Sequence, residues 1–133
     1  QLAKPDVLGG IYRIRKNGAP HVADARGLKL AWATMTPPEL AGLLGDARAD
    51  VQQRAVEALG KKGVAAVAAL RGVLTTGGSA MARQNAVWAL ARIDGGEARA
   101  AVRAALDDAE APVVMSALQG VSLWRDAGAA ARL

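Results

Sequence analysis

Cysteine and phenylalanine are absent from the 133 residues, and His21 is the single histidine. Without thiols the chain has no disulfide framework, no thiolate nucleophile, no zinc finger and no haem-attachment motif. Because a cysteine-free chain is stable in any redox environment, this absence does not indicate a compartment. Aromatic residues are also scarce, the whole set being Tyr12, Trp32, Trp88 and Trp124.

Long apolar runs are missing too. No stretch of about 18 apolar residues occurs, so the sequence predicts no transmembrane helix. No signal peptide is visible either. The chain starts at Gln1 rather than Met, however, so a leader or a whole upstream domain is expected to be missing.

Most of the excess positive charge sits in the first quarter of the chain. The net charge is +5, but residues 1–32 hold six Lys or Arg against two Asp, whereas residues 33–133 hold eleven basic against ten acidic side chains. A solenoid that binds duplex DNA needs basic residues along its whole body, because its affinity comes from many phosphate contacts. The nearly neutral body therefore argues against nucleic-acid binding.

The remaining composition favours helices. Hydrophobic residues make up 52% of the chain, enough for one domain with a core, and 32 residues are alanine. A core of Ala, Leu and Val suits close-packed helices better than a β-sandwich, which favours aromatic and β-branched residues.

An internal repeat organises residues 36–133. Each unit has a first apolar stretch, a short loop and a second stretch of the type Ala-Val-x-Ala-Leu. Ala55, Ala86 and Ala117 fall in one column, 31 residues apart. Two neighbouring columns are apolar in all three units: Val56, Val87 and Leu118, and Leu59, Leu90 and Val121. Apolar positions at i, i+4, i+5 and i+8 form one helical stripe, and a period near 31 built from two helices is typical of an α-solenoid.

Helix-start and helix-stop signals agree with these units. Thr36-Pro-Pro-Glu39 is a capping box with proline in the first turn, Ser79 can cap the helix that carries Trp88, and Pro112 sits at a tolerated first-turn position. The predicted stops are Gly60 or Gly63, Gly95-Gly96, and the region near Gly128. A short helix from about Asp126 is expected to close the stack.

Residues 1–32 do not follow the repeat. Residues 9–18 predict a short strand that ends in an Asn17-Gly18 turn, and Leu28, Ala31 and Trp32 predict a short helix that caps the first unit. We therefore divide the chain into an N-terminal arm, residues 1–32, and a repeat domain, residues 33–133. The predicted fold is an all-α, right-handed α-solenoid of about three two-helix units.

Most candidate catalytic or ligand-binding motifs lack a residue that such a site needs. His21 lies in a proline-containing linker, and no residue near it in the sequence is a clear hydrogen-bond partner, which a general base needs. The acidic loop with Asp107, Asp108 and Glu110 lacks the ligand spacing of a calcium-binding loop. It is typical of a turn between two helices. Residues 77–79 are not a phosphate loop, because neither a preceding strand nor a Lys-Ser/Thr pair is present.

Nucleophilic catalysis has no support, because the serine hydroxyls have no activating base nearby in the sequence. This holds for Ser79, Ser116 and Ser122. The sequence therefore predicts no catalytic, metal-binding or cofactor-binding residue.

The tryptophans carry more information. Trp124 lies seven residues after Ala117 on roughly the same helical face, so we expect it in the core at the C-terminal end. Trp88 shares a column with Glu57 and Gln119, and this polar column predicts a solvated face. On it Trp88 is either a contact anchor, as Trp often is at binding hot spots, or a ring lying over Arg92 and Gln84. The candidate partner-binding residues on the second helices are Gln53, Glu57, Gln84, Trp88, Arg92, Met115 and Gln119.

The two-helix units, with the Leu43-Leu44 to Asp46 loop and second helices such as Ala86-Val87-Trp88-Ala89-Leu90, resemble short HEAT repeats of the phycobilisome-lyase type. The stretches 10–14, 24–32 and 85–90 are similar to the junction, in large exported bacterial proteins, between a dehydrogenase-like β-propeller and HEAT repeats that often precede a cytochrome c module. The chain holds neither the propeller nor a haem-binding motif. The resemblance therefore implies a spacer or docking segment, exported or periplasmic, without redox residues.

The predicted function is a non-catalytic interaction or scaffold module that presents a concave second-helix face to a partner protein or a neighbouring domain. Two alternatives stay open. One is a nucleic-acid-associated solenoid similar to HEAT-like DNA glycosylases, with Trp88, Trp124 and Arg92 as its candidate residues. The other, resting on the resemblance alone, is an accessory or assembly subunit of a redox or cofactor-bearing complex.

Overall fold

The computed structural model describes residues 16–18, 22–76 and 78–132, and within them every regular element is helical. The α-helices and 3₁₀ helices (η) follow one another in the order α1 Pro37–Gly42, η1 Leu43–Gly45, α2 Ala49–Lys62, η2 Gly63–Ala66, α3 Val67–Thr75, α4 Ala80–Leu90, α5 Gly96–Ala104, η3 Ala105–Asp107, α6 Ala111–Leu123 and η4 Ala127–Arg132. The predicted all-α solenoid is confirmed.

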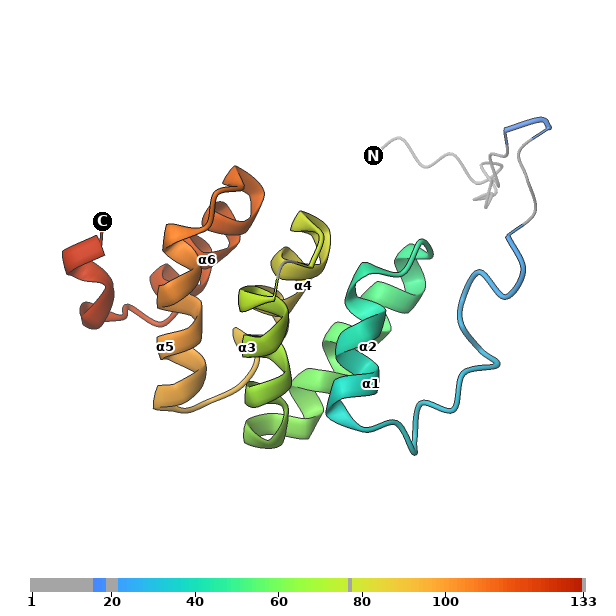
Figure 1. Cartoon of the computed structure of the whole chain (residues 1–133), viewed down its shortest axis with the longest axis horizontal. Coiled ribbons are helices and arrows are strands. Elements are labelled where there is room, and N and C mark those ends of the chain that lie inside the picture. The colour runs from blue at the N-terminus through green and yellow to red at the C-terminus, as the bar shows by residue number, and fades with distance from the viewer. Residues whose placement is uncertain (1–15, 19–21, 77, 133) are drawn as a thin grey trace, which may run out of the picture.

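The helices form three layers that stand side by side, α1 with α2, α3 with α4 and α5 with α6 (Figure 1). The alanine column Ala55, Ala86 and Ala117 is fully buried in all three layers. Small side chains at buried positions let neighbouring helices approach closely, so a larger residue in this column would overpack the stack. One continuous core runs through the stack.

The second helices pack more extensively on one another than the first helices do. Contacts of α4 with α2 and with α6 exceed those of α3 with α1 and with α5. A groove of about 500 Å³ opens between α1 and α3, on the first-helix side. The second helices therefore form a continuous, closely packed row, whereas the first helices leave a groove between α1 and α3.

Most helix-start predictions are confirmed. The Glu39 carboxylate accepts hydrogen bonds from the backbone N–H and the hydroxyl of Thr36, both at 2.7 Å. Ser79 Oγ accepts a hydrogen bond from Ala82 N at 3.1 Å, and Pro112 lies in the first turn of α6. These contacts satisfy N–H groups that have no partner within the helix.

Two of the predicted helix ends are wrong. Gly63 does end α2, with φ of 61°. Gly95 instead precedes α5, since α4 already stops at Leu90. The end of α6 lies at Leu123, before Gly128, because Arg125 takes a left-handed conformation with φ of 47°. The predicted closing helix is present as η4.

Ion pairs connect successive layers. Arg83 of α4 binds both carboxylate oxygens of Asp108 in the next layer, at 2.8 and 3.0 Å. Arg103 of α5 binds Asp126 at 2.7 Å, which holds the start of η4. Between the first two layers, Asn85 Nδ2 donates to the Leu44 carbonyl at 2.8 Å. Each junction thus has a polar contact of its own.

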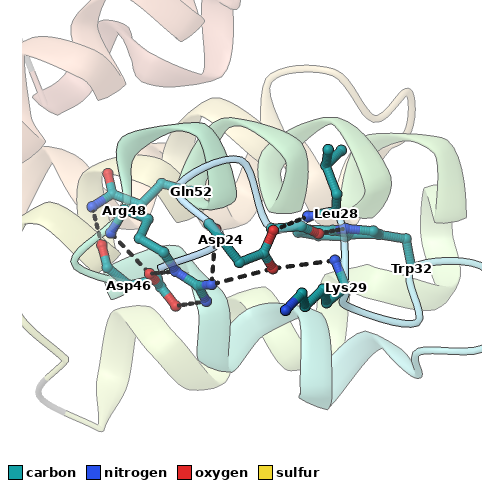
Figure 2. Close-up of polar contacts among 8 residues, drawn as sticks. Asp24, Leu28, Lys29, Trp32, Asp46, Arg48 and Gln52 are labelled. Atoms are coloured by element: carbon teal, nitrogen blue, oxygen red, sulfur yellow. Dashed lines mark hydrogen bonds and ion pairs between the residues drawn. The ribbon is translucent and has the colours of Figure 1, made fainter. Parts of the chain in front are cut away.

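The predicted capping helix near Trp32 is wrong, because residues 22–34 form consecutive turns instead. Asp24, with φ of 46°, bonds through its carboxylate to the N–H groups of Leu28 and Lys29, and these bonds close a turn that competes with a helix (Figure 2). Asp24 also faces Arg48 at 3.7 Å. The turn thereby attaches to the first repeat.

Glycine is required in this turn. Gly27 is buried with φ of 62°, and a Cβ there would lie 2.7 Å from Val51 Cγ2. The Trp32 indole N–H donates to the Gly27 carbonyl at 2.7 Å, and Arg54 lies 5.8 Å from the indole ring centre. Trp32 packs against the core as predicted, but from a turn.

The Asn17-Gly18 turn is present, with Gly18 at φ of 73°. The first part of the predicted strand, up to residue 15, and His21 lie outside the described residues. The division of the chain at residue 32 remains a prediction.

Candidate functional site

The seven predicted contact residues all lie on the second-helix row or directly beside it. Five of them are exposed: Gln53, Glu57, Arg92, Met115 and Gln119. The other two, Gln84 and Trp88, are half-buried. Glu57 and Gln119, which share the column of Trp88, are exposed as the solvated face predicts, whereas the Trp88 ring packs partly against the core.

A groove of about 290 Å³ runs between α2 and α4. It brings together three of the predicted residues, Gln53, Trp88 and Arg92. Glu57 shares an adjacent, more polar groove with Gln53. The remaining predicted residues, Gln84, Met115 and Gln119, line neither groove.

The sequence analysis missed four residues that line the Trp88 groove: Ala49, Gln52, Val56 and Asn85. Asn85 lies three residues before Trp88 and therefore on the same side of the helix, which is a signal that could have found it. Its Nδ2 also donates to Gln52 Oε1 at 3.2 Å. Gln52 Nε2 donates to the carbonyl of Asp46. These hydrogen bonds hold both amide side chains in fixed positions at the groove wall.

Arg92 does not stack on Trp88. The cation–π contacts among the described residues are Arg54 with Trp32 and Arg99 with Trp124, the latter at 5.4 Å. The stem of Arg92 instead lies against Gly60, where a Cβ would come within 3.1 Å of it. Trp88 and Arg92 therefore line the same groove without a cation–π contact between them.

Trp124 lies at the end of α6, half-buried against the core, which agrees with the predicted packing role. Arg99 of α5 covers the ring. This arrangement makes Trp124 a structural contact between the two helices of the third unit.

The acidic side chains with the clearest pKa shifts have structural partners. Arg48 hydrogen-bonds Asp46 at 2.8 Å and lowers the pKa of that carboxyl to about 2 (Figure 2). Arg83 likewise lowers the pKa of Asp108, and the hydrogen bonds from Thr36 lower that of Glu39. A catalytic acid near neutral pH needs a raised carboxyl pKa, so these shifts serve folding.

The remaining candidate sites have structural explanations. In the acidic loop, Asp108 binds Arg83 and Asp107 binds Arg132. The described residues contain no group of acidic or histidine side chains that could hold a metal ion. Ser116 is buried, and its hydroxyl donates to the Pro112 carbonyl at 3.0 Å within α6. No helix of the described part is long and apolar enough to cross a membrane.

The groove geometry fits binding: one indole ring, an apolar floor from Ala49 and Val56, and polar side chains around it. The comparison with protein families gives one match, to HEAT repeats, over residues 36–122. Searches of the curated proteins and of the solved structures find no match. HEAT repeats are generally non-catalytic protein-interaction scaffolds. Because the match spans more than half of the chain and coincides with the helical layers, this protein belongs to the HEAT repeat family.

Proposed function

We propose that the protein is a non-catalytic scaffold module that binds a partner protein, or a neighbouring domain, through the groove between α2 and α4. The observation that carries this proposal is the placement of Trp88. Its ring is half-buried, lines the groove together with Val56 of the opposite helix, and makes no cation–π contact with Arg92. Trp is enriched where few residues supply most of the binding free energy.

The surroundings of Trp88 suit a polypeptide partner. Gln52 and Asn85 are held by hydrogen bonds inside the protein, while Gln53 and Arg92 are exposed at the rim. An apolar centre with a polar rim is the usual anatomy of a protein interface. Because α6 continues the row of second helices, a partner in this groove would also reach Gln119 of α6.

The resemblance to exported proteins that join a β-propeller to HEAT repeats supports a more specific proposal. If this chain has the same role as the HEAT segment of those proteins, its partner is a domain of the same assembly, and its location is outside the cytoplasm. A role beside a cofactor-bearing subunit belongs to the same hypothesis. We do not favour nucleic acid as the ligand, because the repeat body is nearly neutral.

Site-specific photocrosslinking tests the proposal. A photoreactive amino acid at Gln53 is expected to give a defined crosslinked product in cell extract of the source organism, and the same amino acid at Arg71, exposed on α3, is expected to give none. Adding Trp88→Ala should reduce the Gln53 product at least tenfold, since such an anchor contributes about 2 kcal/mol or more. Circular dichroism confirms that the variant is folded. An undiminished product in folded Trp88→Ala contradicts the assignment.

A further inference from the structure

The C-terminal end of the stack has an uncovered surface that is distinct from the Trp88 groove. A second groove, of about 470 Å³, is lined by Leu118, Val121 and Ser122 of α6 together with residues 125–127. Val121 is nearly buried, whereas Leu118 is half-exposed. The groove follows the side of α6 that points away from α4.

The repeat shows what this side of a second helix normally contacts. Leu118 occupies the column of Val56 and Val87, which are 7% and 0% exposed. Val56 lines the Trp88 groove together with residues of α4, so this column faces the next second helix. Ser122 is similarly equivalent to Gly60, which lies against Arg92 of the next layer. In the first two layers this side is therefore covered by the following second helix.

Half of a fourth layer is already present. Ala129 of η4 is fully buried and stands 31 residues after Ala98 and 62 after Val67, both nearly buried on the first helices α5 and α3. The ion pair of Arg103 with Asp126 holds η4 in this place. Thus η4 takes the position of a fourth first helix, beyond α5 in Figure 1. No described residue packs in the place of a fourth second helix.

The outer face of α6 also differs from those of α2 and α4. Between Ala111 and Leu123 the helix carries no charged residue. Met115 is 65% exposed where the earlier units have glutamine, and Leu123 is 69% exposed where they have Lys61 and Arg92. An exposed apolar side on a helix whose equivalents are covered by the next layer indicates a surface that is covered in the functional assembly.

We propose that this end of the stack is a docking surface for an amphipathic α-helix of a partner protein. The helix takes the place of a fourth second helix and presents to α6 the side that α4 presents to α2, on which Asn85 and Trp88 line the shared groove and Arg92 lies against Gly60. Continuity with the interfaces of α4 with α2 and with α6 identifies this chemistry. A second copy of the chain cannot supply such a helix end to end, because the turn at residues 24–32 covers its α2 edge.

The test adds a helix of known fit. The full chain is extended by a flexible Gly-Ser linker and a second copy of residues 79–94, so that a weak contact is measured at high effective concentration. We expect the urea midpoint of unfolding to rise by about 0.5–1 M. The control extension carries Ala86→Arg in the added helix and should give no rise.

Substitutions in the chain itself locate the contact. In the extended chain, Leu118→Glu should abolish the rise in the urea midpoint. Val64→Glu, at an exposed position on η2, should leave that rise unchanged. A free peptide of residues 79–94, added to ¹⁵N-labelled chain, should shift the amide signals of Leu118, Ser122 and Ala127.

Either of two results overturns the proposal. One is an equal midpoint for the extended chain and its Ala86→Arg control. The other is a dimer of the unextended chain in sedimentation that Leu118→Glu dissociates, because the surface then binds a second copy. Neither result involves the Trp88 groove of the native chain, so the proposed function is tested separately.

Discussion

Two glycines inside helices should respond to alanine with opposite signs. Gly72 lies within α3, and a Cβ there meets nothing within 4 Å. Gly72→Ala should stabilise the protein by about 0.5–1 kcal/mol, because alanine loses less backbone entropy on folding. Gly120 lies within α6, where a Cβ would come 3.0 Å from Val102 Cγ1.

The gain in helix propensity at Gly120 is opposed by this contact. Val102 is fully buried on α5, so it has little room to move. Overpacking in a dense core costs about 1–3 kcal/mol, against a propensity gain of about 1 kcal/mol. We therefore expect Gly120→Ala to be destabilising, with a net cost of up to about 2 kcal/mol.

Urea unfolding of both variants, followed by circular dichroism at 222 nm, measures this difference. The two variants should differ by about 0.5–3 kcal/mol when the gain at Gly72 and the cost at Gly120 are combined. Equal stabilisation by both substitutions would refute the reasoning, since α5 and α6 would then not approach closely at Gly120.

Two further predictions concern the core and the polar junctions. Leu90→Ala should lower the free energy of unfolding by about 2–5 kcal/mol, because Leu90 is 0% exposed at the centre of the stack, and an unchanged denaturation midpoint would contradict that placement. Asp46 has a folded pKa of about 2, below its ordinary value, so its contribution to stability is complete above about pH 4 and is lost as the pH falls toward 2. Urea midpoints at pH 7, 4 and 2.5 should therefore show Asp46→Asn less stable than the parent at pH 7, with a difference that becomes clearly smaller between pH 4 and pH 2.5. A difference that does not depend on pH would argue against the ion pair with Arg48.

The sequence predicted the helix face on which Trp88 lies but not the groove that it lines. The helix face of Trp88 follows from its spacing to Ala86, but the groove needs Val56 and Gln52 of α2, which lie more than thirty residues earlier. The extent to which Trp88 is covered depends on how closely α2 approaches α4. Helical periodicity places a side chain on a face and does not give the distance to the next helix.

The N-terminal turn shows why local spacing is insufficient. Leu28, Ala31 and Trp32 have helical spacing, yet Asp24 closes a turn with the N–H groups of Leu28 and Lys29. Trp32 then finds its hydrogen-bond partner in the Gly27 carbonyl. A side chain that competes for backbone donors, together with packing on the first repeat, outweighs a weak helical pattern.

The sequence by itself determined the helical layers, the buried alanine column and most helix starts, because period, small residues and capping groups act within one or two turns of the chain. Only the tertiary structure decided which face carries a groove, which second helix is left uncovered and where the Arg–Asp pairs form. Arg83 and Asp108 are 25 residues apart, and Asn85 and Leu44 are 41 apart. Such partners meet only after the layers have stacked, since their distance is set by the packing of the intervening helices.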